Sequence, residues 1–339
     1  MSSIIRGWKQ LITFCLLLFA IAGCSSVPSL EENPWEVIEV PTENNLLDIT
    51  FTDDLQHGWL VGSEGILLQS KDGGQTWQEK QLDLPQRDQV RLSSVSFAGE
   101  EGWVIGEPSV ILHTEDGGET WSRISISEKL PGQPRTVAAL GKNQAEMTTT
   151  VGAIYRTEDG GQNWKAMVQD AAGVMRNISR SPTGGYVAVS SRGNFYSTWQ
   201  PGEDEWNSYQ RNTSRRLQNM GYDPQGRLWL LARGGQVQLT QADNPEEWTE
   251  PMYPELATSW GLLDLAYRTD REIWVVGGSA QLLYSPDHGK NWYKDRDVEK
   301  IPANFYRVKF FSPETGFVIG QRGILLKYVG SSQAIAQTS

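Results

Sequence analysis

The chain has 339 residues, and its 41 acidic and 30 basic side chains give a formal net charge of −11. This acidic balance argues against nucleic acid as a partner, because binding to a phosphate backbone needs clustered positive charge. The two cysteines, Cys15 and Cys24, both lie near the N-terminus. They cannot form a disulfide framework for the rest of the chain, so a hydrophobic core must hold it.

Residues 1–23 have the features of an export signal. Arg6 and Lys9 precede an apolar run from Leu11 to Ala22 that is too short to span a bilayer comfortably. The run ends in Ile-Ala-Gly-Cys24, which resembles the bacterial lipobox, in which the cysteine becomes the lipidated first residue of the mature chain. An ordinary signal peptide or an uncleaved anchor is the alternative. We therefore expect a lipoprotein signal peptide over 1–23 and attachment to a membrane through an acyl lipid on Cys24.

The next segment, residues 24–33, contains the small, polar and acidic stretch SSVPSLEEN. This composition predicts a flexible tether between the lipid and a folded domain. Removal of Arg6 and Lys9 with the signal leaves 28 basic and 41 acidic residues, a formal charge of −13 on the mature chain.

A repeat of about 43 residues occupies positions 34–330. Its clearest marker is a tryptophan that ends a short acidic, glycine-rich motif. The copies are Trp77, Trp121, Trp164, Trp206, Trp248 and Trp292, and the steps between them are 44, 43, 42, 42 and 44 residues. Extending the series backward by 42 residues reaches Trp35, whereas extending it forward reaches no tryptophan near 335.

Each repeat reads as four short strands, because alternating and β-branched residues are separated by turn residues. Inner strands are expected to begin near 46, 91, 136, 177, 217, 262 and 305. Seven units of this kind predict an all-β fold, a seven-bladed β-propeller with four-stranded blades. The seventh unit lacks its outer strand, so we expect the strand of Trp35 to complete it and close the ring. Residues 331–339 remain as a C-terminal tail.

The repeated motif, written SKDGGQTW at 70–77, resembles the Asp-box, or BNR, repeat. Its aspartate is expected to accept hydrogen bonds from nearby amides and fix a tight turn, while its tryptophan packs on the blade. A calcium loop would need acidic ligands at several alternate positions. We therefore assign a structural role, with no metal and no cofactor, to the four well-kept aspartates: Asp72, Asp116, Asp159 and Asp287.

Enzymatic function is not favoured by the motifs. Asp-boxes occur in sialidases, but the Arg-Ile-Pro segment expected of a sialidase is absent. His57, His113 and His288 are far apart in sequence, and their spacing does not suggest a metal site. The chain also has no nucleophile elbow and no phosphate-binding glycine loop. These observations predict a protein that is not an enzyme.

One stretch differs from the acidic remainder. Between 171 and 235 there are eight arginines, four acidic residues and no lysine. In an up-and-down blade, the start of the inner strand and the loop between strands two and three lie on one face, opposite the Asp-box turns. This topology predicts a partner-binding surface for an acidic segment, since arginine binds carboxylates through two parallel hydrogen bonds. We assign to it Arg176, Arg180, Arg192, Arg211, Arg215, Arg216 and Arg233, although the topology leaves the position of Arg180 open and places Arg227 at the other end.

The lipobox, the tether, the Asp-box units and the arginine-rich middle together resemble the cyanobacterial BNR-type propeller family of photosystem II assembly factors. The phrases GWLVGSEGILLQSKDGGQTW and GFVIGQRGILLKY carry this resemblance, which covers the whole chain. It implies an assembly and repair factor that binds the newly made reaction-centre core subunit and early assembly complexes. It also implies a location at the lumenal side of the thylakoid membrane or the periplasmic side of the plasma membrane.

Two other functions remain open at this point. An exported glycan-binding propeller lipoprotein should show a ring of aromatic residues near the inner-strand starts, where only Trp260 and Tyr306 qualify. A diverged sialidase-like glycoside hydrolase should present paired carboxylates in the central channel. We expect a monomer in each case.

Overall fold

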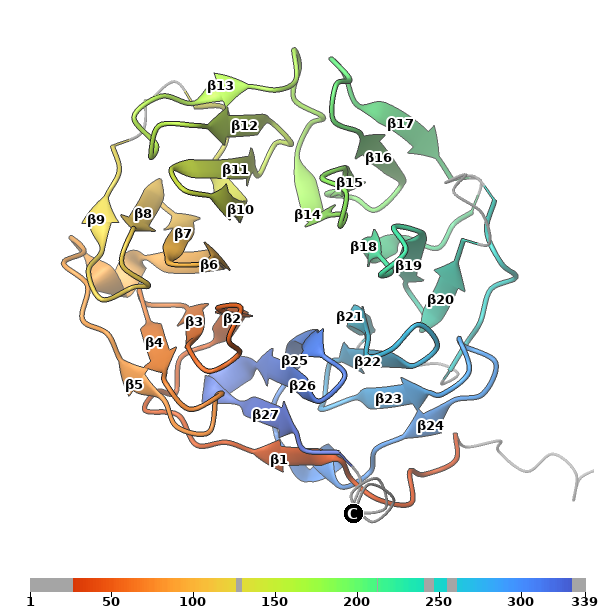
Figure 1. The fold of residues 1–339 in the computed structure, drawn as a ribbon. Helices are drawn as coiled ribbons and strands as arrows, with labels where there is room; N and C mark the ends of the chain where they lie inside the picture. The colour runs from red at the N-terminus through yellow and green to blue at the C-terminus, as the bar shows by residue number, and fades with distance from the viewer. Residues whose placement is uncertain (1–26, 126–129, 212, 241–246, 255–260, 331–339) are drawn as a thin grey trace, which may run out of the picture.

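Seven inner strands surround a central channel, and each belongs to a separate antiparallel sheet (Figure 1). The computed structural model describes residues 27–125, 130–211, 213–240, 247–254 and 261–330. The predictions for residues 1–23, Cys24, Trp260 and 331–339 lie outside these ranges. The inner strands are β2 (Leu46–Phe51), β6 (Arg91–Ala98), β10 (Pro134–Gly141), β14 (Met175–Arg180), β18 (Leu217–Tyr222), β21 (Leu262–Tyr267) and β25 (Phe305–Ser312).

The other strands follow outward in the order that the sequence predicts. The second strands are β3 (Gly58–Gly62), β7 (Glu101–Glu107), β11 (Gln144–Thr149), β15 (Tyr186–Ser190), β19 (Leu228–Ala232), β22 (Ile273–Gly277) and β26 (Thr315–Gly320). The third strands are β4 (Leu67–Ser70), β8 (Val110–Thr114), β12 (Ile154–Thr157), β16 (Phe195–Trp199), β20 (Gln236–Leu239), β23 (Leu282–Ser285) and β27 (Leu325–Tyr328). The outer strands are β5 (Gln78–Glu79), β9 (Ser122–Arg123), β13 (Lys165–Ala166), β17 (Asn207–Gln210), β24 (Tyr293–Lys294) and β1 (Trp35–Val37). We number the blades one to seven from β2 to β25.

Helical structure is limited to short turns in the described residues. These are the 3-10 helices η1 (Arg87–Gln89), η2 (Val298–Lys300) and η3 (Gln321–Gly323). In the ranges that the structure covers, no helix has the length and apolar character needed to cross a bilayer. The expected all-β, seven-bladed propeller is confirmed.

Three second strands contain a glycine followed by an aromatic residue, Gly58-Trp59 in β3, Gly102-Trp103 in β7 and Gly316-Phe317 in β26, and packing explains the glycine. Every residue of β3 is buried, because this strand lies between neighbouring blades. A Cβ added at Gly58 would lie 2.5 Å from the Phe51 ring, and one at Gly102 would lie 2.4 Å from the Phe97 ring. Glycine is therefore required where an aromatic ring of the inner strand crosses the second strand.

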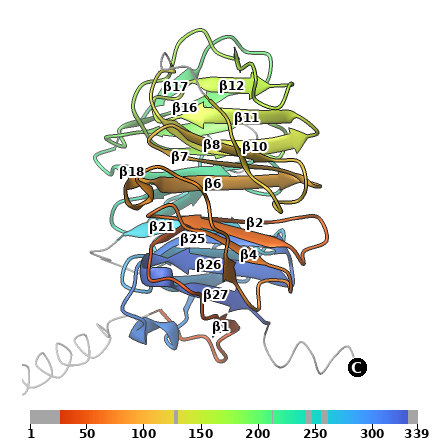
Figure 2. The same ribbon diagram turned by 90° about the vertical axis from the view of Figure 1, so that its left-hand side faces the viewer.

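The ring closes through the N-terminal strand, as predicted. In β1, Trp35 pairs with Tyr328 and Val37 with Leu326 of β27, so blade seven contains both ends of the propeller (Figures 1 and 2). The pairing provides hydrogen-bond partners for the backbone N–H and C=O groups along the edge of β27, which would otherwise be exposed.

Blade five departs from the four-stranded prediction. Its sheet has three strands, and the segment after Trp248 contributes only isolated bridges, Thr240 to Trp248 and Val237 to Met252. Pro251 lies between these two bridges and has no N–H to donate, so a regular outer strand cannot continue there.

The segment before β1 is held more closely than a free tether would be. The amide of Lys294 donates to the carbonyl of Pro28 at 2.8 Å, and the amide of Leu30 donates to the carbonyl of Lys294 at 2.9 Å. Arg296 adds hydrogen bonds to the Ser29 hydroxyl at 2.8 Å and to the Val27 carbonyl at 3.1 Å. Of the tether expected over 24–33, residues 27–30 are therefore docked on the rim of blade six.

Candidate partner-binding site

The Asp-box aspartates are occupied by their own turns. One oxygen of Asp116 accepts hydrogen bonds from the Thr120 amide at 2.9 Å and the Thr114 hydroxyl at 2.7 Å, and the other accepts from the Thr120 hydroxyl at 2.6 Å. The hydrogen bonds from Thr120 and then from Thr114 lower the pKa of Asp116 to about 2. Asp72, Asp159 and Asp287 accept the equivalent bonds from Thr76, Asn163 and Asn291. These carboxylates stabilise turns and are not directed at an external ligand.

The same motif also joins neighbouring blades. Gly118, with a positive φ, lies against the Trp59 ring of the preceding blade, where an added Cβ would come within 2.1 Å. Trp121 packs edge-on against the same Trp59 ring at 5.6 Å, and Trp164 packs likewise on Trp103 at 5.8 Å. The repeated eight letters therefore build a turn and, in addition, an interface between blades.

The arginine-rich stretch lies mainly on the face opposite the Asp-box turns. The amide of Arg233, in the loop between β19 and β20, donates to the carbonyl of Arg216 at 2.9 Å, just before β18. The amide of Ser191, in the loop between β15 and β16, donates to the carbonyl of Val174 at 2.9 Å, just before β14. Inner-strand starts and second loops thus share one face, as expected. We call the arginines of this face the arginine patch: Arg176, Arg192, Arg211, Arg215, Arg216 and Arg233.

Within the patch, the guanidinium groups are supported by neutral partners. Arg176 donates to the Ser191 carbonyl at 2.9 Å and to the Leu217 carbonyl at 3.2 Å, which ties blade four to blade five. Arg215 donates to the Arg233 carbonyl at 3.3 Å and lies over the Tyr253 ring at 5.0 Å. Arg211 donates to the Gln238 amide oxygen at 3.0 Å.

No carboxylate of the described residues is in an ion pair with any of these six side chains. Arg192, Arg215, Arg216 and Arg233 are exposed, and Arg176 and Arg211 are half-buried. Burial, and then the charge of Arg233, lowers the pKa of Arg176, while burial lowers that of Arg211. The patch therefore has unpaired positive charge, part of which is desolvated, in a strongly acidic protein.

Arg180 does not belong to this surface. It ends β14 next to the hairpin toward β15, at the opposite end from Arg176, and pairs with Tyr186 in the strand register. Its Nε lies 3.0 Å from the carboxylate of Glu146, which is 7% exposed in blade three. We predicted that Arg180 lies in the partner-binding surface, and this placement is wrong. The residue lies at the opposite end of the blade, where it neutralises a buried carboxylate. Arg227 lies at the far end, as expected, where it pairs with Asp223 at 2.7 Å.

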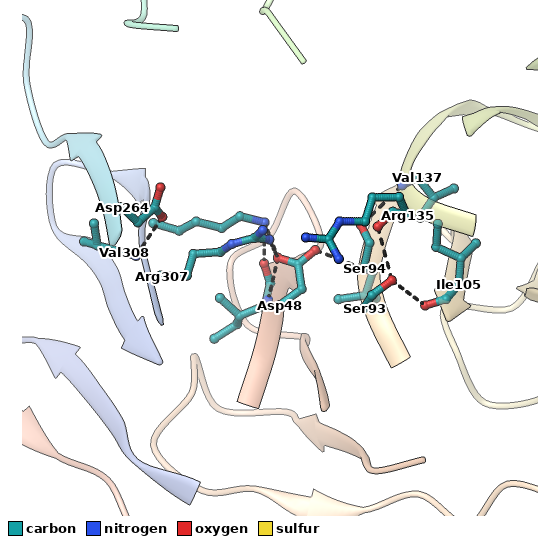
Figure 3. A network of polar contacts seen from close by, with 12 residues as sticks. Asp48, Ser93, Ser94, Ile105, Arg135, Val137, Asp264, Arg307 and Val308 are labelled. Carbon is teal, nitrogen blue, oxygen red and sulfur yellow. Dashed lines mark hydrogen bonds and ion pairs between the residues drawn. The ribbon is translucent and has the colours of Figure 1, made fainter. Parts of the chain in front are cut away.

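A second cluster of charged side chains lines the central channel, which has a volume of about 1070 Å³. Arg307 and Lys309 of blade seven both donate to one oxygen of Asp48 in blade one, each at 2.6 Å (Figure 3). The other Asp48 oxygen accepts from the Val95 amide of blade two at 3.1 Å. Burial raises the pKa of Asp48, but Lys309 and Arg307 outweigh it and lower the value to about 2. This network joins the last blade to the first.

Two features of this region were not predicted from the sequence. The Asp48 network was missed. The sequence did offer a signal, because Asp48 and Arg307 each lie two residues after the start of an inner strand and so occupy equivalent positions of the repeat. The support of Arg215 by Tyr253 was also missed, and no sequence pattern signals it. Within the described ranges, no group of three His, Cys, Asp or Glu side chains is arranged to hold a metal ion.

Comparison with known proteins identifies close relatives. The family described as "Photosynthesis system II assembly factor YCF48" matches residues 27–329. The chain is 59% identical to the photosystem II assembly lipoprotein Ycf48 of Nostoc sp. (strain PCC 7120 / SAG 25.82 / UTEX 2576), over 99% of this chain and 98% of the relative. It is 57% identical to the photosystem II assembly protein Ycf48 of Thermosynechococcus vestitus, over 90% of this chain and 87% of the relative.

Solved structures agree with this result. A structure described as "YCF48 bound to D1 peptide" superposes with a TM-score of 0.88 at 53% identity, covering 91% of this chain and 99% of that one. YCF48 from Cyanidioschyzon merolae superposes with a TM-score of 0.80 at 40% identity, covering 87% and 98%. Virginiamycin B lyase, at 11% identity and a TM-score of 0.67, shares the fold alone. The resemblance seen in the sequence is confirmed, and the chain belongs to the Ycf48 family of photosystem II assembly factors.

Proposed function

We propose that this protein assists the assembly and repair of photosystem II by binding the newly made D1 subunit through the arginine patch. The observation that carries the proposal is the gathering of six arginines on one face of a chain with a net charge of −11, none of them paired with a carboxylate of the described residues. A family member 53% identical to this chain has been solved with a D1 peptide. Family membership favours this function over the glycan-binding and hydrolase alternatives.

The chemistry of the patch suits an acidic or carboxylate-bearing segment of D1 and of the early complexes that contain it. Guanidinium groups form paired hydrogen bonds with carboxylates, and these are stronger where water is partly excluded. Arg215 is held by Tyr253 and by the Arg233 carbonyl, so its orientation is set before a partner arrives. The acidic remainder of the surface discourages contact with other anions.

Replacing Arg215 and Arg216 together with alanine should weaken binding of a D1 peptide by about tenfold or more, because two exposed charge-assisted contacts are lost. Isothermal titration calorimetry at low and at physiological salt measures the effect. The wild-type affinity should fall more steeply with salt than that of the double variant.

Arg123, an exposed arginine of β9 away from the patch, supplies the matched control. Its replacement with alanine removes one positive charge and should leave peptide affinity nearly unchanged. If the loss of binding free energy in the Arg123 variant is half of that in the double variant, net charge alone drives binding, because one charge is removed and not two. No loss in the double variant would remove the patch from the proposal.

We also propose that the protein is held at the lumenal side of the thylakoid membrane, or at the periplasmic side of the plasma membrane, with the rim of blade six toward the bilayer. Several Ycf48 relatives are named lipoproteins. Only two residues, Ser25 and Ser26, lie between Cys24 and Val27, which is docked on blade six. The three extended steps from Cys24 to Val27 reach about 10 Å. A tether free over its whole length would reach about three times as far and would leave the orientation undetermined.

A single cysteine introduced into the mature chain can report this orientation, because Cys24 is the only native cysteine left after removal of the signal. A fluorophore at Lys300→Cys, on blade six, should be strongly quenched by quencher-bearing lipids in vesicles that contain the lipidated protein. The same fluorophore at Lys165→Cys, on β13 across the ring, should be weakly quenched (Figure 1). Equal quenching at the two sites would contradict the edge-on orientation.

A further inference from the structure

The central channel contains positive charge that the arginine patch does not explain. Among the residues that the structure describes, nine charged ones line it, namely Arg91, Arg135, Arg176, Arg180, Arg307 and Lys309 against Asp48, Asp223 and Asp264. Most of them are balanced. Arg180 pairs with Glu146, Asp223 pairs with Arg227, and Arg307 and Lys309 meet Asp48 with Asp264 nearby. Arg91, Arg135 and Arg176, which come from three consecutive blades, have no acidic partner in the described part of the chain.

These three arginines differ in the number of hydrogen bonds that their side chains donate to the protein. Arg176 donates to two backbone carbonyls of neighbouring segments. Arg135 is half-buried and donates through Nη2 to the Arg176 carbonyl at 3.0 Å. Arg91 is exposed at the start of β6, and in the part of the chain that the structure describes its side chain has no hydrogen bond or ion pair.

The surroundings of Arg135 are electropositive. Burial lowers its pKa, and the charges of Arg91 and Arg307 lower it further. Glu107 is the one carboxylate that acts in the opposite direction, and its effect is the smallest of the four. A guanidinium that is removed from water and faces two other cations is costly unless an anion joins it.

We propose that Arg91 and Arg135, with Arg307 behind them, form a binding site for a single carboxylate or similar oxyanion at the patch-side mouth of the channel. Arg135 lines a cavity with room for the group, and only its Nη2 is engaged, by the Arg176 carbonyl, among the described residues. Arg307 comes from blade seven and meets Asp48, which Figure 3 draws between the Arg307 and Arg135 head groups. The low-dielectric wall strengthens each contact. Arg192, Arg215, Arg216 and Arg233 do not line the channel, so this site is distinct from most of the patch.

The anion has two possible sources, a free oxyanion in solution or a carboxylate on the partner segment that the proposed function assigns to the neighbouring patch. The channel site does not depend on that function. It predicts anion binding by the isolated protein, which can be measured without a partner.

The test compares thermal stability of wild type and Arg135→Gln while sodium acetate replaces sodium chloride at constant ionic strength. The wild-type melting temperature should rise with acetate, because a ligand that binds only the folded state stabilises it. The variant should not respond. Without acetate, Arg135→Gln should melt no lower than wild type, because it relieves repulsion from Arg91 and Arg307.

Two variants make the result specific. Arg233→Gln removes a patch arginine outside the channel and should keep the full acetate response. Arg135→Lys keeps the charge but loses the fork, and its apparent Kd for acetate should be at least about tenfold weaker. An equal response in Arg135→Gln, or a variant that melts lower than wild type in the absence of acetate, would overturn the proposal, because Arg135 would then be satisfied by the protein itself.

Competition identifies the source of the anion. If acetate raises the apparent Kd of a D1 peptide in wild type but not in Arg135→Gln, the site takes a carboxylate of the partner. If peptide binding is insensitive to acetate while the melting temperature still responds, the ligand is a free oxyanion. Loss of peptide binding in the Arg215 and Arg216 variant with an intact acetate response separates the patch from the channel.

Discussion

Replacing Trp35 with alanine should lower the free energy of unfolding by about 3–5 kcal/mol, the range for a large buried aromatic. Trp35 is 5% exposed, and its ring lies 5.2 Å from Trp274 of blade six and 5.3 Å from Tyr328 of its own blade, both edge-on. It therefore fixes β1 to the ring and joins the last two blades. Urea unfolding followed by circular dichroism and by tryptophan fluorescence measures the change.

Val37, two residues further along β1, is the matched control. Its side chain is 54% exposed, so Val37→Ala should change the free energy of unfolding by less than about 0.5 kcal/mol. If Trp35→Ala costs no more than Val37→Ala, closure by the N-terminal strand does not stabilise the propeller.

The closure was predictable because the tryptophans mark equivalent places in every blade. Trp35 lies 42 residues before Trp77, and the missing tryptophan near 335 indicates where the chain stops one strand short. The same periodicity predicts the inner strands, since the observed starts lie within two residues of the expected positions. Blade number and order thus follow from local patterns repeated along the chain.

Features that depend on contacts between distant segments were not predictable in the same way. Asp48 and Arg307 are 259 residues apart and meet only after the ring has closed. Arg180 carries the same charge as the patch arginines, but the end of the strand on which it lies directs it to Glu146. The docking of Pro28 and Leu30 on β24 has no signal in their composition, which is that of a flexible tether.

The arginine patch was predictable in part. The loop positions of Arg192 and Arg233 follow from the blade topology, and the structure has them on the face of the inner-strand starts. Sequence alone did not indicate which arginines have acidic partners. That distinction comes from the structure: across the ranges it describes, the six patch arginines and Arg135 have no ion pair, while Arg180 and Arg227 have one each.

Replacing Asp48 with alanine should destabilise the propeller by about 3–5 kcal/mol, because it leaves Arg307 and Lys309 in the channel without their shared anion. The Val95 amide of blade two also loses its acceptor. The loss of stability should therefore be largest at the junction of blades one, two and seven. Hydrogen exchange should show faster opening of β2, β6 and β25 than of β14, which lies away from the network.

The pH dependence of stability gives an independent check of the same network. The pKa of Asp48 is lowered to about 2 from its usual 3.8, so its stabilisation is complete above pH 4 and is lost as the pH falls toward 2. Burial raises the pKa of Asp264 to about 6 despite the opposing charge of Arg307, so this carboxyl makes stability fall as the pH rises from about 4 to 6.

Asp264→Asn separates the two contributions because the amide cannot ionise and keeps an oxygen acceptor for the Val308 amide. We expect this variant to lose the decline between pH 4 and 6. Its stability at low pH should be lower than that of wild type, because the second Asp264 oxygen accepts a hydrogen bond from the Asn219 amide at 2.9 Å and the Asn NH2 group cannot. Asp48→Ala should instead lose the steep dependence between pH 4 and 2. Urea unfolding at half-unit steps from pH 2 to 7 measures both profiles. An Asp48→Ala protein as stable as wild type at pH 7 would mean that Arg307 and Lys309 are neutralised by another group, and the junction of the first and last blades would then not depend on this carboxylate.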